Sequence, residues 1–172
     1  MSLPFLAEIL RLFTAFVLLA AVWGKLRNLG AFRANLSDSF GMPAALGRLA
    51  APSLVAAELL LAAAILGPFA TAGMLAALAL FAGFTALLSV KFVREGAFRC
   101  ACFGETERNL SGLDLLRNLL VAGAIGAWCA LAGAGMTPHA GFHVMLLAAG
   151  LALILAVLAV EFHDIVNLLR TY

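Results

Sequence analysis

Two cysteines separated by one residue are the part of this sequence best suited to chemistry. Cys100 and Cys102 lie in the most polar segment of the chain, which spans residues 91–114. Two thiols this close can form a small, strained disulfide ring, and a strained disulfide is easily reduced. The pair is therefore typical of a site that cycles between a dithiol and a disulfide.

The same cysteines admit two other interpretations. Thiolates are soft ligands, so Cys100 and Cys102 could instead hold a soft metal ion such as Cu(I), Zn(II) or Hg(II). Their spacing could also be coincidental, although the chain has only 3 cysteines in 172 residues. The third, Cys129, stands alone in an apolar stretch and is expected to be a small packing residue.

Glu58 is the second candidate for chemistry, because it lies in the middle of an apolar segment. A charge near the centre of the hydrocarbon costs at least about 2.5–3.5 kcal/mol, so it should be paired or functional. We expect an ion pair with Arg11 or Arg117, a protonated and hydrogen-bonded glutamate, or a proton acceptor beside the thiols. Glu8 and Arg11, three residues apart on one helix face, are expected to pair with each other.

The composition shows that lipid surrounds most of the chain. It is 65% hydrophobic and 12% charged, with a mean hydropathy of +1.08. Soluble domains average roughly 45–50% apolar and about 25% charged residues, so soluble, disordered and nucleic-acid-binding classes are excluded. The net charge of +2 gives no reason to expect a nucleic-acid partner. The partner of most of the surface is the lipid bilayer.

Five segments are long and apolar enough to cross a bilayer as helices, which takes about 20 residues. They cover about residues 4–23, 49–66, 69–90, 115–132 and 141–160. We expect an all-α, polytopic transmembrane bundle forming a single domain over residues 1–172. Gly67-Pro68 predicts a tight hairpin between the second and third spans. The first segment lacks a basic start and a small-residue cleavage pattern, which indicates an uncleaved span.

Between the first and second spans, apolar side chains recur every fourth residue, at Phe32, Leu36 and Phe40. This pattern predicts a short amphipathic helix in the membrane interface. Small residues four apart, such as Gly73 and Ala77, are typical of helix contacts in membranes. A second pair of this kind is Gly126 and Ala130. In a chain this rich in alanine such pairs occur by chance, so they carry little weight.

Basic residues predict the orientation. Ten of the 11 follow the first, third or fifth span: Lys25, Arg27, Arg33, Arg48, Lys91, Arg94, Arg99, Arg108, Arg117 and Arg170. The positive-inside rule therefore places these segments and the C-terminus in the cytoplasm and the N-terminus outside. This is the arrangement expected of a multi-pass protein of the bacterial inner (plasma) membrane.

Several motifs resemble a known family. The most specific are Cys100-x-Cys102-Phe103-Gly104 and Arg117-Asn118-Leu119-Leu120 at the beginning of the fourth span, and weaker ones are Gly24-Lys25-Leu26, Pro43 and Glu58. Over roughly residues 6–133 the chain is similar to the MauE family of methylamine utilization proteins, within the wider DoxX-like redox-associated membrane proteins. The resemblance implies a four-helix core, to which the fifth span is added. It also implies maturation of methylamine dehydrogenase, whose small subunit is rich in disulfides, with the help of a thioredoxin-like partner.

Charge and chemistry disagree about the face on which the cysteines lie. Disulfides of exported proteins form on the outer face, whereas the basic residues place Cys100 and Cys102 on the cytoplasmic face. Either the pair exchanges electrons with a cytoplasmic thioredoxin-like protein, or the charges near Cys100 serve the site and the predicted orientation is reversed.

The leading hypothesis is a membrane thiol–disulfide relay in which Cys100 and Cys102 react, Arg117 orients the site and Glu58 handles protons. Its partners would be a thioredoxin-like protein and a redox client that contains disulfides. The alternatives are a soft-metal carrier using the same two thiolates, and a non-catalytic assembly subunit of a membrane redox complex. No cofactor is expected, because the 13 phenylalanines are spread over all the spans and give no support to a quinone site.

Overall fold

The computed structural model describes residues 3–96, 111–135 and 142–171. Within these ranges every regular element is a helix. The helices are α1 (Leu3–Arg27), α2 (Leu29–Phe40), α3 (Ala44–Leu66), α4 (Ala70–Glu95), α5 (Gly112–Gly133), α6 (Phe142–Val160) and α7 (Phe162–Thr171). The expected all-α fold is confirmed.

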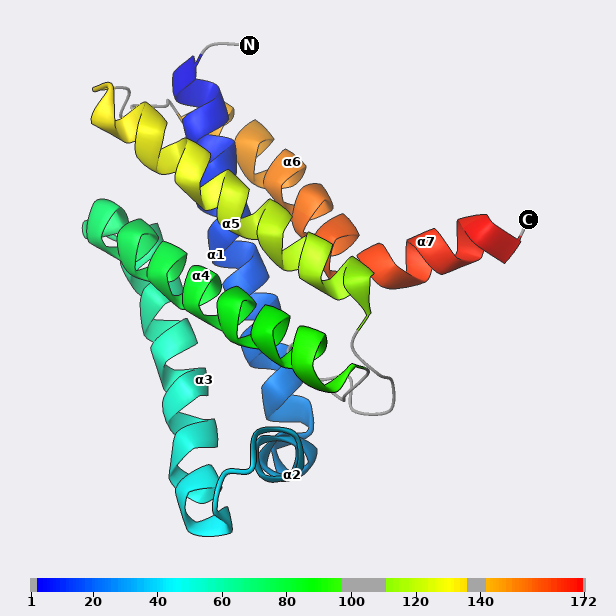
Figure 1. Ribbon diagram of the computed structural model, residues 1–172. Coiled ribbons are helices and arrows are strands. Elements are labelled where there is room, and N and C mark those ends of the chain that lie inside the picture. The colour runs from blue at the N-terminus through cyan, green and yellow to red at the C-terminus, as the bar shows by residue number, and fades with distance from the viewer. Residues whose placement is uncertain (1–2, 97–110, 136–141, 172) are drawn as a thin grey trace.

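Five of these helices, α1, α3, α4, α5 and α6, are long and apolar enough to cross a membrane, so the five predicted spans are confirmed. The helix α1 lies at the centre of the bundle (Figure 1), with Ala15, Val17 and Leu18 fully buried. It packs against α3 and α5, and α4 packs against both of these, so the four helices form a closed core. The helix α6 packs on α1 outside this core. The chain is a multi-pass membrane protein.

The hairpin between α3 and α4 turns at Gly67-Pro68, as predicted, and brings the two helices into close contact. A Cβ atom on Gly73 would lie 2.9 Å from Cγ1 of Ile65 and 3.0 Å from its backbone nitrogen, closer than packed atoms approach. Gly73 therefore marks a helix contact. Gly126 does not, since no described atom lies within 4 Å of the position its Cβ would take.

The helix α2 runs across the bundle rather than along it, and Figure 1 shows it nearly end-on. The Asn28 side chain caps its N-terminus by accepting a hydrogen bond from the Ala31 N–H, and Gly41 ends it in a left-handed conformation (φ 61°). Phe32 is buried and packs on Ala51 of α3. The amphipathic helix predicted for this segment is confirmed, and its apolar face covers the beginning of α3.

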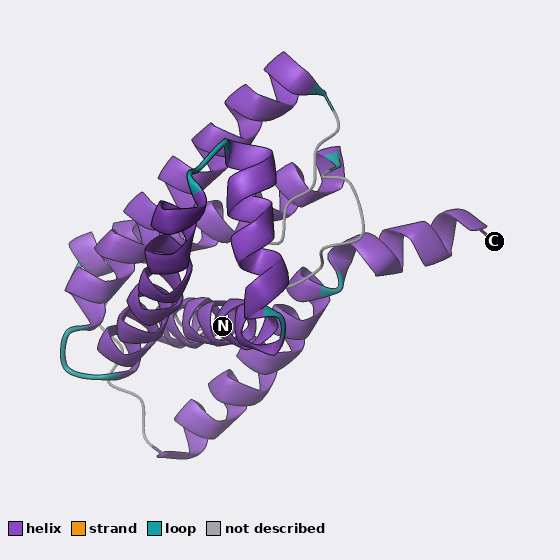
Figure 2. Ribbon diagram, turned by 90° about the horizontal axis from the view of Figure 1, so that it is seen from below, coloured by secondary structure: helices purple, strands orange, loops and turns teal. Residues whose placement is uncertain are grey.

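The helix α7 was not expected from the sequence. The chain bends at Glu161, yet its N–H still donates to the Val157 carbonyl, and its carbonyl accepts from the Ile165 N–H. Almost no backbone bonding is lost at the bend, so a second helix follows directly. This helix projects away from the bundle in Figures 1 and 2.

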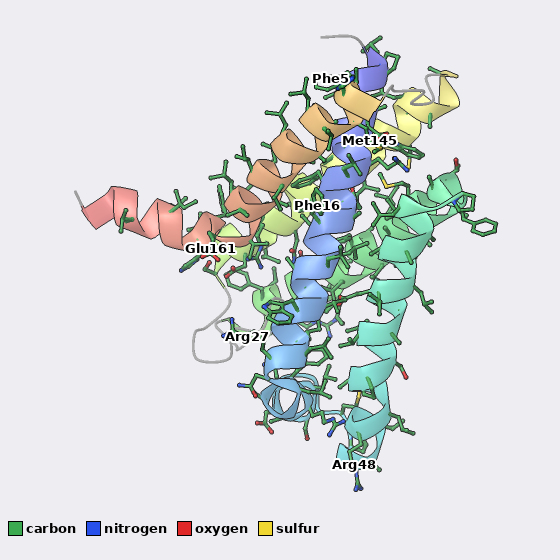
Figure 3. All side chains as sticks on the ribbon, turned by 180° about the vertical axis from the view of Figure 1, so that it is seen from behind. Phe5, Phe16, Arg27, Arg48, Met145 and Glu161 are labelled. Carbon is green, nitrogen blue, oxygen red and sulfur yellow. The ribbon has the colours of Figure 1, made fainter. Side chains whose placement is uncertain are left out.

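One end of the bundle holds α2, the beginnings of α3 and α5, and the ends of α1, α4 and α6. We call it the α2 end. By the basic-residue count, it is the end predicted to face the cytoplasm. In Figure 3, Arg27 and Arg48 lie at this end and Phe5 lies at the opposite end.

Candidate functional site

Two groups of buried polar residues lie at the α2 end. The central cluster consists of Lys25 on α1, Glu58 on α3 and Asn118 on α5. The α5 cluster consists of Ser111, Asp114 and Arg117 at the beginning of α5. All of these except Ser111 are buried, although most neighbouring residues in the same helices are apolar. Polar side chains gathered inside a membrane bundle mark a candidate site.

Lys25 and Glu58 form a buried ion pair that joins α1 to α3. The Lys25 ammonium donates to both carboxylate oxygens of Glu58, at 2.7 and 2.8 Å, and the two side chains are only 3% and 9% exposed. Helical side chains lean toward the N-terminus of their helix. Since α1 and α3 run in opposite directions, Lys25 reaches back into the bundle, Glu58 reaches toward the α2 end, and the two meet.

The predicted partners of Glu58, Arg11 and Arg117, are therefore wrong. Arg11 binds Glu8 at 2.6 and 3.0 Å, which confirms that predicted pair, and it also donates to the Ile65 carbonyl at 3.0 Å. Arg117 donates to the Val160 carbonyl at 3.3 Å.

The error has a geometric cause. The predicted second span started at residue 49, but α3 starts at Ala44, and its first turns lie beside α2 beyond the end of α1. Glu58 is consequently close to the last turn of α1, where Lys25 is the available cation.

The helix α2 shields this ion pair. The Lys25 nitrogen lies 5.7 Å from the centre of the Phe32 ring, a distance at which the negative face of the ring attracts a cation. Phe32 is itself only 4% exposed. The helix α2 thus covers the ion pair at this end of the bundle. The Lys25 ammonium has two partners, the Glu58 carboxylate and the Phe32 ring.

Asn118 completes the central cluster. Its side chain is 2% exposed and faces a cavity of about 40 Å³ that Lys25 and Glu58 also line. The remaining walls come from the apolar side chains Ala21, Leu54, Leu80, Phe81 and Phe84. All four core helices contribute to this cavity, which lies between them and is partly open at one side.

The α5 cluster fixes the beginning of α5. Asp114 Oδ2 accepts hydrogen bonds from the N–H and the hydroxyl of Ser111, both at 2.9 Å, and Asp114 Oδ1 lies 3.7 Å from the Arg117 guanidinium. The Ser111 oxygen is also 3.2 Å from Nδ1 of His163 on α7. Together with the Arg117 bond to the Val160 carbonyl, these contacts tie α5 to α6 and α7. The contact with His163 gives α7 a role in holding this helix.

The predicted site residues are only partly brought together. Glu58 belongs to the central cluster and Arg117 to the α5 cluster, although Asn118 follows Arg117 directly in the sequence. Cys100 and Cys102 lie outside the described residues. Cys129 is half-buried and packs against the core, as a packing residue should.

Lys25 and Asn118 are the site residues that the sequence analysis missed. Lys25 was counted only as an orientation charge, and Asn118 only as the polar start of a span. A signal existed for both, because each belongs to a motif that carries the family resemblance.

Comparison with known proteins supports that resemblance. Residues 3–132 match the family described as methylamine utilisation protein MauE. The match covers α1 to α5 almost completely and leaves out α6 and α7, so it corresponds to the closed four-helix core with α2. No curated protein and no solved structure matches the chain. The match extends over well more than half of the chain, which therefore belongs to the MauE family of methylamine utilisation proteins.

Proposed function

We propose that this protein is a membrane thiol–disulfide relay in which Cys100 and Cys102 alternate between dithiol and disulfide. The observation that carries the proposal is the position of the pair in the chain. It belongs to the connection between Glu95, where α4 ends, and Gly112, where α5 begins, and both of these helix ends are at the α2 end with the two polar clusters. The fixed start of α5 favours a site there, because a reactive group works best on a rigid support.

The proposed reaction is an exchange with a thioredoxin-like protein. One cysteine, as thiolate, attacks a partner sulfur, forming a mixed disulfide and releasing the partner's other sulfur as a thiolate. The second cysteine then attacks the first and releases the partner's remaining sulfur. The Cys100–Cys102 disulfide forms, the partner's disulfide is reduced, and the two thiol protons end on the partner's two sulfurs. The reverse sequence passes a disulfide in the other direction.

Arg117 and Glu58 have supporting roles in this proposal. The Arg117 guanidinium is held by Asp114 and the Val160 carbonyl close to the beginning of α5, where its charge would favour a thiolate. Glu58 would either accept a thiol proton transiently or serve to fix the bundle. Its two contacts with Lys25 favour the second role.

The family suggests what the relay serves. A role in methylamine utilisation fits its name, and the sequence resemblance suggests the disulfide-rich small subunit of methylamine dehydrogenase as the client. We place the protein in the bacterial inner membrane, with the N-terminus outside and the α2 end in the cytoplasm. The distribution of basic residues supports this orientation.

Trapping of the mixed disulfide tests the proposal. Cells producing Cys100→Ser or Cys102→Ser would be quenched with acid, alkylated and analysed on non-reducing gels followed by mass spectrometry. One of the two variants should accumulate a reducible adduct with a thioredoxin-like protein, because the resolving thiol is missing. Cys129→Ser is the matched control and should give none.

Two results would contradict the relay. Full function of the double Cys100→Ser/Cys102→Ser variant in cells would favour an assembly subunit. Stoichiometric bound metal in the purified protein, lost in that double variant, would favour a carrier. Labelling of Cys100 and Cys102 by a membrane-impermeant maleimide in intact cells would reverse the orientation proposed above.

A further inference from the structure

The cavity of the four-helix core contains more polar groups than its direct contacts satisfy. Two hydrogens of the Lys25 ammonium go to Glu58, and each Glu58 oxygen accepts one of them. A carboxylate oxygen has lone pairs for further bonds, and an ammonium has a third donor. The Lys25 ammonium and the Glu58 carboxylate can therefore each make further hydrogen bonds beyond those to one another.

Asn118 adds an entire amide to this cavity. The residue is 2% exposed, and among the described residues its side chain has no hydrogen-bond partner. A buried amide normally finds a partner in the protein or in ordered water, since an unmade hydrogen bond is costly. Helix α5 is anchored at its start, so Asn118 cannot simply turn outward to find one.

The size of the cavity indicates what the partner is. Its volume is about 40 Å³. A buried water needs roughly 10–15 Å³ of such space and two to four polar partners. The cavity thus has room for a small number of waters, and the ammonium, carboxylate and amide supply the partners. The rings of Phe81 and Phe84 and the other apolar walls leave little space for a larger ligand.

We propose that this cavity is a water-binding site, in which buried water bridges the Asn118 amide to the Lys25–Glu58 pair. The water satisfies Asn118 and lowers the cost of keeping an ion pair inside the bundle. It links α5 to α1 and α3, and so joins the helix that follows the cysteine segment to the centre of the core. The site does not depend on the chemistry of the cysteines.

Hydroxyl-radical footprinting of the purified full-length protein tests this proposal, because short X-ray pulses convert bound water to radicals that label adjacent side chains. Phe81, which lines the cavity, should be labelled even though it is 9% exposed. Met74, on the same helix as Phe81, is fully buried in the same core and does not line the cavity, so it is the internal control. Although its sulfur reacts readily with hydroxyl radicals, Met74 should be labelled several-fold less than Phe81.

Variants at position 118 decide the outcome. Asn118→Leu keeps the number and branching of the side-chain heavy atoms but has no polar group, and it should reduce the labelling of Phe81 several-fold. Asn118→Ser keeps a polar group and enlarges the space, so labelling should persist. Ile125→Val, two turns further along α5, is the matched control. Unchanged labelling of Phe81 in Asn118→Leu would overturn the proposal.

Thermal stability gives an independent reading. In a dry cavity, leucine would relieve an unsatisfied amide and raise the melting temperature. In a hydrated cavity, leucine displaces bound water and leaves the ion pair with fewer partners, so the melting temperature should fall. A rise in Asn118→Leu would contradict the water site even if the footprinting were positive.

Discussion

The Lys25–Glu58 pair should be the most sensitive polar contact in the bundle, because both side chains are almost fully buried and join different helices. Lys25→Met leaves a carboxylate inside the core, and Glu58→Leu leaves an ammonium there. Removing one partner of a buried ion pair costs about 3–5 kcal/mol, whereas replacing both with apolar residues is often neutral or stabilising. The double variant Lys25→Met/Glu58→Leu should therefore be closer in stability to the wild type than either single variant.

The assay is a double-mutant cycle in detergent micelles, with unfolding followed by the fluorescence of Trp23 and Trp128. The sum of the losses in the two single variants should exceed the loss in the double variant by about 3 kcal/mol or more, and this difference is the coupling energy of the pair. Arg48→Met removes an exposed cation at the same end, and it should change the unfolding free energy by no more than about 0.5 kcal/mol. Additive effects of the two single variants, or losses as small as that of the control, would refute the buried-pair argument.

Three further predictions concern packing and helix ends. Gly73→Ala should destabilise the protein by about 1–3 kcal/mol through overpacking against Ile65, whereas Gly83→Ala on the same helix, with no described atom within 4 Å, should not. Phe32→Leu removes the cation–ring contact and should lower the free energy of unfolding by about 0.5–2 kcal/mol. The loss should be smaller in a Lys25→Met background, and an equal loss in both backgrounds would exclude the contact. Asp114→Ala removes the carboxylate that accepts the Ser111 N–H at the beginning of α5, and it should lower the free energy of unfolding by about 0.5–2 kcal/mol. An unchanged midpoint of thermal unfolding would contradict this capping role.

Apolar runs and turn residues made most of the fold predictable. Each long apolar segment had one low-energy solution in lipid, a helix, and Gly67-Pro68 could not continue one. The helix α7 was missed because it is short and only Glu161 separates it from the spanning helix α6. At such a position a hydropathy profile shows only the end of the apolar segment.

The candidate site was less predictable because its contacts depend on the relative heights of the helices. The sequence identified Glu58 as a charge that needed a partner, but choosing Lys25 over Arg11 requires knowing how far α3 extends beyond α1. The importance of Asn118 was hidden for a similar reason. An asparagine near the start of a span is ordinary, and only the packing of four helices shows that this one faces the ion pair.

The central claim is that Cys100 and Cys102 exchange two electrons as a pair. Differential alkylation in a Cys129→Ala background, with membranes equilibrated in buffers of graded dithiol and disulfide ratio, measures this directly. We predict that both thiols become protected together at one midpoint and are released together on reduction, with a slope for two electrons. Complete alkylation of both cysteines at every ratio, without prior reduction, would contradict the relay.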